Sequence, residues 1–146
     1  MDNNELLFRL KQTVGDDLAV LETINNEMVY AVPVEKWLNV AALLTKEWGN
    51  IHLSAITAQQ REELEGQIEV MYHFWQGQGI TFVLTLPADH PEIPSLIEMI
   101  PGADFYEREA AEMFGIYFTG REATPHLLLP DDWDKAPPFM GKEIHD

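Results

Sequence analysis

The sequence predicts a single α+β domain with a mostly antiparallel sheet of about five strands, flanked by helices and followed by an extended, proline-rich C-terminal arm. Apolar residues recur first at helical and then at strand spacing, in the order helix, hairpin, helix, strands. No repeat or linker divides the chain, and proline is concentrated after residue 86. We therefore predict a domain over residues 1–124 and a docking arm over residues 125–146.

Composition narrows the classes of function. The chain has 146 residues, 25 acidic against 9 basic side chains and a formal charge of -16, a balance that disfavours nucleic acid and anionic lipid. It contains no cysteine, which excludes disulfides, thiolate zinc sites and cysteine-ligated iron–sulfur clusters. No apolar run approaches the ~20 residues that a membrane span requires. The expected partners are proteins, with no direct membrane span.

The N-terminal half contains two predicted helices around a hairpin. Asp2 and its two following asparagines suit a helix start, and Gly15 suits the helix end. Residues 18–24 and 27–32 are predicted to form the hairpin. Pro33 then precedes a second helical stripe, which consists of Trp37, Leu38, Ala41, Leu44 and Trp48.

Three further strands are predicted over residues 51–58, 67–75 and 80–86. The middle strand carries apolar residues on both faces. Ile68, Val70, Tyr72 and Phe74 alternate on one face, whereas Met71 and Trp75 fall on the other. Such a sheet must be covered on both sides, by its own helices or by another chain.

A last helix is predicted between Pro101-Gly102 and Gly115, with Tyr106, Ala110 and Met113 facing inward. Two local polar patterns accompany it. Asp104 and Glu107 have the spacing of a capping box, and Arg108 and Glu112 have the spacing of an i,i+4 ion pair.

Catalytic alternatives are few. Glu107, Glu109 and Glu112 could form a paired-carboxylate site, but capping and solvation are the favoured explanation of such a cluster. His52 and His73 could face each other on neighbouring strands, but none of the five histidines has a metal-binding spacing. The chain has no phosphate-binding glycine loop and no nucleophile motif.

Residues 93–133 carry an ordered series of motifs: I-P-S at 93–95, G-A-D-F-Y at 102–106, E-R-E at 107–109, E-M-F at 112–114, G-I-Y-F-T-G at 115–120 and L-L-L-P-D-D-W at 127–133. This series resembles the family of the 30-kilodalton subunit of respiratory complex I (NADH-quinone oxidoreductase), which includes the related subunit of membrane-bound hydrogenases. The signature or interface residues that the resemblance implies are Asp104, Tyr106, Glu107, Arg108, Glu109, Glu112, Phe114, Gly115, Phe118, Gly120, Leu129, Pro130, Asp131, Asp132 and Trp133.

The resemblance implies a non-catalytic subunit in the peripheral electron-transfer arm of an ion-translocating, NADH:quinone-type oxidoreductase. Its partners would be the large catalytic subunit (49-kilodalton or hydrogenase large-like) and a neighbouring iron–sulfur subunit, on the cytoplasmic side of the membrane. Catalytic, cofactor and metal sites are expected to be absent from this chain, with iron–sulfur clusters, and in a hydrogenase nickel–iron, held by the partners.

Two departures from the family pattern keep alternatives open. The chain has Thr124-Pro125-His126 where the family has His-Pro sooner after its glycine motif, and residues 137–142 lack the family's basic tail. These differences favour the equivalent subunit of an energy-converting [NiFe] hydrogenase as the first alternative. A stand-alone hydrolase using the paired carboxylates is an alternative from a different class.

Overall fold

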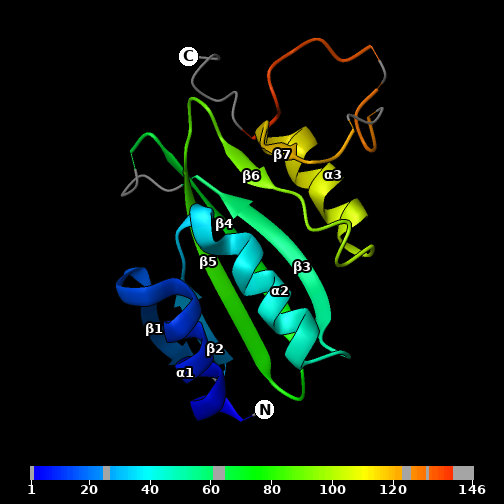
Figure 1. The fold of residues 1–146 in the computed structure, drawn as a ribbon. Helices are drawn as coiled ribbons and strands as arrows, with labels where there is room; N and C mark the ends of the chain where they lie inside the picture. Colours follow the sequence, from blue (N-terminus) through cyan, green and yellow to red (C-terminus); the bar gives the residue numbers. More distant parts are fainter. Residues whose placement is uncertain (1, 25–26, 61–64, 123–125, 131, 140–146) are drawn as a thin grey trace.

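The computed structural model describes residues 2–24, 27–60, 65–122, 126–130 and 132–139, with side chains of residues 22–24 left out (Figure 1). The elements follow in the order α1 (Asn3–Val14), β1 (Ala19–Ile24), β2 (Glu27–Ala31), α2 (Trp37–Glu47), β3 (His52–Gln59), β4 (Gln67–Trp75), β5 (Gly79–Pro87), β6 (Glu92–Pro94), α3 (Ala103–Phe114) and β7 (Tyr117–Thr119). Single 3-10 turns, Gly15–Asp17 and Val34–Lys36, follow α1 and precede α2.

The main sheet has the strand order β1-β2-β5-β4-β3. Three of its neighbouring pairs are antiparallel, and β2 with β5 is parallel, so the sheet is mixed but mostly antiparallel as predicted. The parallel pair is possible because α2, β3 and β4 form a long connection between β2 and β5. The α+β prediction is confirmed. A second, two-stranded parallel sheet of β6 and β7 was not expected from the sequence.

The N-terminal helix begins and ends where the sequence indicates. The Asp2 carboxylate accepts a hydrogen bond from the backbone N–H of Glu5 at 2.8 Å, and Gly15 adopts a positive φ of 85° after the last turn. In α2 the predicted stripe is buried except for Leu38, which is 42% exposed, and so its inward assignment was wrong. The helix starts at Trp37, after a 3-10 turn, and this start rotates Leu38 away from the sheet.

The core lies between the sheet and the helices on one of its faces (Figure 1). Ile68, Val70, Tyr72 and Phe74 of β4 point into it, as predicted from their alternation. The Trp37 ring packs 4.6 Å from Tyr72 and 5.4 Å from Phe82. Beyond β3, α3 and the β6–β7 pair form a second layer at one end of the sheet, and this layer carries the signature motifs.

Candidate functional site

Glu107 lies at the centre of the second layer with its side chain fully buried. One carboxylate oxygen accepts hydrogen bonds from the Ser95 hydroxyl at 2.6 Å and from Arg121 Nη1 at 3.0 Å. The other oxygen accepts from the backbone N–H of Leu96 at 2.7 Å. Glu107 therefore ties α3 to the turn after β6 and to the segment after β7.

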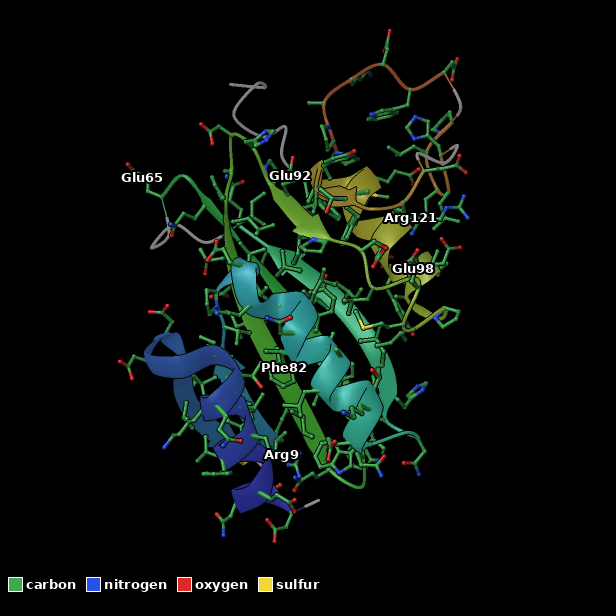
Figure 2. All side chains as sticks on the ribbon, viewed as in Figure 1. Arg9, Glu65, Phe82, Glu92, Glu98 and Arg121 are labelled. Atoms are coloured by element: carbon green, nitrogen blue, oxygen red, sulfur yellow. The ribbon has the colours of Figure 1, made fainter. Side chains whose placement is uncertain are left out.

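Arg121, two residues after the end of β7, completes this cluster, and its side chain is only 11% exposed (Figure 2). Its second terminal nitrogen donates to the Asp104 carboxylate. Burial alone would lower the pKa of Arg121, but the bonds to Asp104 and Glu107 outweigh it and raise the pKa above its ordinary value. The guanidinium is thus charged and shared between two carboxylates, an arrangement that suits a buried ion pair.

The predicted capping box is wrong. The helix begins at Ala103, whose backbone N–H bonds to Ile100 at 2.9 Å, so Gly102 and not Asp104 precedes its first turn. Glu107 then falls on the buried face with Ala103 and Ala110, one turn to either side. The Asp104 side chain instead lies beside Arg121 and 4.0 Å from Arg108.

Glu112 forms a second anchor at the other end of α3. Its carboxylate, only 4% exposed, accepts three consecutive backbone N–H bonds, from Leu127 at 2.5 Å, Leu128 at 2.6 Å and Leu129 at 3.0 Å. His126 Nδ1 lies 3.0 Å away. Burial would raise the pKa of Glu112, but these hydrogen bonds outweigh it and lower the pKa. Glu112 was expected to pair with Arg108; instead it holds the start of the C-terminal arm.

A cavity of about 240 Å³ lies between the two anchors. The residues that line it include Arg108, Tyr117, Glu122, Glu107 and Glu112. Both carboxylates already accept several internal hydrogen bonds, which leaves them poorly suited to exchange protons with a substrate.

Comparisons with known proteins relate this sequence to a known family. The sequence model of the family described as "Respiratory-chain NADH dehydrogenase, 30 Kd subunit" matches residues 30–141. The chain belongs to this family. An NADH-quinone oxidoreductase subunit from Roseiflexus castenholzii is 31% identical over 94% of this chain and 82% of its own length. The corresponding subunit from Moorella thermoacetica is 32% identical over 84% of this chain and 83% of its own length.

Solved structures share the fold. A trypsin-resistant fragment of Nqo5 superposes with a TM-score of 0.69 at 20% identity, covering 82% of this chain and 99% of the fragment. A chain of the membrane-bound sulfane sulfur reductase, an archaeal respiratory membrane complex, gives 0.72 at 23% identity, covering 99% of this chain and 84% of the other.

The remaining residues of the 30-kilodalton-subunit signature lie around the two anchors. Phe118 is buried on β7, whereas Tyr106 and Glu109 are half-buried on α3. Ala103, Glu107 and Ala110 form the fully buried face of α3, so the predicted inward set was right for Ala110 and only partly right for Tyr106 and Met113.

Two signature glycines occupy left-handed conformations. Gly115 ends α3 with φ 73°, and Gly120 follows β7 with φ 84°. At Gly115 an added Cβ would also meet Pro137 Cγ at 3.0 Å. Both the backbone conformation and the contact with the arm therefore favour glycine at this position.

The described part of the arm contacts α3 of its own chain. The backbone N–H of Phe139 donates to the Met113 carbonyl at 2.9 Å, and the Phe139 ring lies 5.2 Å from that of Phe114. Trp133 is half-buried, with its indole N–H directed at the Ala136 carbonyl at 3.3 Å. Leu129 is half-buried, and Pro130 and Asp132 are exposed. Asp131 and the predicted boundary between residues 124 and 125 lie outside the described residues, so the division into domain and docking arm stays a prediction.

The histidine pair is not formed. His52 lies opposite Trp75, and His73 lies opposite Ala55, because an irregularity between Leu53 and Ala55 shifts the register of β3 on β4. Within the described residues, no three histidine, cysteine or acidic side chains are placed to bind one metal ion. Likewise, no described helix has both the length and the apolar character of a membrane span.

Proposed function

We propose that this chain is a non-catalytic structural subunit in the peripheral electron-transfer arm of a complex I-type, ion-translocating oxidoreductase of the NADH:quinone type. In this role it supports the large catalytic subunit. The proposal is supported mainly by the hydrogen bonds of two carboxylates in the family signature. Glu107 and Glu112 accept internal hydrogen bonds that hold together α3, β7 and the arm. Catalytic carboxylates would need to be available to a substrate.

The partners proposed are the large 49-kilodalton-type subunit and a neighbouring iron–sulfur subunit. These chains would hold the iron–sulfur clusters, because this sequence offers no cysteine ligand. The complex would be attached to the membrane through other subunits, with this chain on the cytoplasmic side.

The C-terminal sequence supports a second candidate, the equivalent subunit of an energy-converting [NiFe] hydrogenase. Residues 137–142 lack the basic tail of the NADH:quinone-type family pattern. In that case nickel–iron would belong to the large partner subunit.

The experiment is purification of the tagged chain from its own cells, followed by identification of the stoichiometric partners. We expect a large catalytic subunit and an iron–sulfur subunit, and their activity with NADH or with hydrogen separates the two candidates. Isolated chain should show no turnover. Ester, glycoside or phosphoester hydrolysis by isolated chain, lost in a Glu107→Gln variant, would instead support the hydrolase that uses paired carboxylates.

A further inference from the structure

The face of the main sheet that points away from α1 and α2 is mostly apolar. Strand register places its side chains in two rows that cross all five strands. One row consists of Leu21, Val29, Thr81, His73 and Ala55, and the next consists of Ala19, Ala31, Val83, Met71 and Thr57. We call these two rows the outward face. They alternate along each strand with the core residues, which places them opposite the helices.

The composition of the outward face is unusual for a surface in contact with water. Apart from Thr57, His73 and Thr81, every position in the two rows is aliphatic or methionine, and none is charged at neutral pH. Leu21, on the edge strand β1, is 41% exposed. Trp75, two residues after His73 on β4, is 54% exposed. Among the described residues the covering helices α1 and α2 lie on the opposite face. The solvent-exposed face of an antiparallel sheet normally carries polar residues. The mostly apolar outward face is therefore typical of an interface.

The polar groups within the outward face satisfy one another. The Thr81 hydroxyl donates to Glu27, whose side chain crosses Gly79 to reach it. His73 Nδ1 lies 3.1 Å from the Thr81 oxygen, and His73 Nε2 lies 3.0 Å from the Thr57 hydroxyl. Since Thr81 gives its only hydrogen to Glu27, it accepts from His73 Nδ1–H, and neutral Nε2 accepts from Thr57. A partner could cover these rows without leaving a donor or acceptor unpaired.

The charge of the chain indicates which class of molecule binds the outward face. Two carboxylates border the rows: Glu27, which accepts from Thr81, and Glu69, which accepts from Gln59 at 2.7 Å. The chain as a whole is acidic, and the described positions of the two rows contain no lysine or arginine. A second copy would bring like charges together across the interface, and the net charge of -16 opposes contact with an anionic membrane. A different protein with basic side chains beside an apolar strip would complement both features.

We propose that the outward face binds another protein subunit, through an apolar strip on that subunit flanked by lysine or arginine side chains. The proposal rests on the proposed function, because it takes the partner from the same complex. It places a contact surface on the main sheet, separate from α3, the arm and the signature residues. Trp75 is the aromatic anchor at its end, since exposed tryptophans often dominate the energetics of interfaces.

Thiol labelling tests this surface directly, because the chain contains no cysteine of its own. Met71→Cys introduces a single thiol on the outward face. Phe8→Cys is the matched control, on α1, where Phe8 is 61% exposed. Rates of maleimide labelling are compared between the isolated chain and the purified complex. We expect labelling of Met71→Cys to slow at least tenfold in the complex and that of Phe8→Cys to change less than twofold.

The outcomes separate the surface from the function. If the chain co-purifies with its complex while Met71→Cys labels at the free rate, the surface is wrong and the proposed function stands. If wild-type chain purifies alone, the proposed function fails and the surface fails with it. Slow labelling of Met71→Cys in a dimer of isolated chain, or on phosphatidylglycerol vesicles, would assign the face to a second copy or to lipid and overturn the proposal.

Substitution of Trp75 by alanine provides a second test of the surface. Trp75→Ala and Phe8→Ala chains each compete with wild type for incorporation into the complex. We expect at least tenfold less incorporation of Trp75→Ala, with an unchanged melting temperature for the isolated chain, and wild-type incorporation of Phe8→Ala. Equal incorporation of both variants would count against the surface.

Discussion

At the scale of single residues, Glu107 and Glu112 have the same chemistry and comparable burial but hold different segments. Glu107 shares a buried guanidinium and joins α3 to the turn after β6, whereas the partners of Glu112 among the described residues are three amides of the arm and His126. Burial of a carboxylate is tolerated in each case because its oxygens have donors at short range. Removal of any of these donors should therefore reduce the stability of the layer formed by α3, β6 and β7.

Arg121→Met should destabilise the chain by about 3–5 kcal/mol, because it leaves the Glu107 carboxylate buried without its cation. Urea unfolding measures the effect. The double variant Glu107→Gln with Arg121→Met removes both charges and should recover part of the loss, since no buried charge of this pair is then left uncompensated. If the double variant loses as much free energy of unfolding as Glu107→Gln and Arg121→Met lose together, the two side chains are not energetically coupled.

Glu112 should make stability depend on pH on the acidic side. Its pKa is lowered in the folded chain, so its contribution is complete above the unfolded value of about 4.3 and is lost as the pH falls through the lower folded value. Glu112→Gln should cost about 1–3 kcal/mol at pH 7 by weakening the bonds to residues 127–129. The difference from wild type, measured by denaturant unfolding at several pH values, should shrink below a pH of about 4. A constant difference would contradict this role.

At the scale of elements, the start of α1 is fixed by contacts within the same helix, whereas the arm is held by contacts with a helix that is distant in the sequence. The start of α1 is local, because Asp2 caps it within one turn. The arm has no regular secondary structure beyond turns among its described residues, and its order depends on α3.

Asp2→Ala should lower the free energy of unfolding by about 1 kcal/mol through loss of the cap on the Glu5 N–H. Thermal melting and helical circular dichroism measure the change. Asp104→Ala provides a comparison on α3, where the carboxylate does not cap the helix, and its effect should depend on Arg121 being present. An unchanged melting temperature in Asp2→Ala would show that α1 does not need this cap.

Removal of the residues after Pro130 should abolish incorporation into the complex and also lower stability modestly, by about 1–2 kcal/mol. The loss of stability is expected because Phe139 contacts Met113 and Phe114 of the same chain. Co-purification and thermal melting of the truncated chain test the two parts separately. Normal assembly of the truncated chain would contradict a docking role for the arm.

At the scale of the whole molecule, the fold is layered and asymmetric. Helices cover one face of the main sheet, the signature layer extends from its β3 side, and the outward face carries apolar rows. Such an arrangement suits a chain whose surfaces are completed by neighbours.

Purified chain should be colourless and contain no stoichiometric iron, nickel or zinc, because its sequence has no cysteine and no metal-binding histidine spacing. Metal analysis and an absorption spectrum measure this. The intact complex serves as the control and should carry the iron of its other subunits. One bound metal ion per isolated chain would contradict a cofactor-free subunit.

The sequence by itself determined the local elements, because helix periodicity, strand alternation and turn residues act over a few positions. β4 was predicted at its observed length, and the hairpin strands and Gly15 were placed within about one residue. It also indicated Glu107 and Glu112 through the motif series, although it assigned them local partners. Only the tertiary structure decided that their partners are Ser95, the amide of Leu96, Arg121 and the amides of residues 127–129, between 11 and 17 positions away. The parallel β2–β5 pair, and an outward face that neither α1 nor α2 covers, were likewise decided by packing, since the order of strands depends on which apolar faces meet and not on the pattern within any one of them.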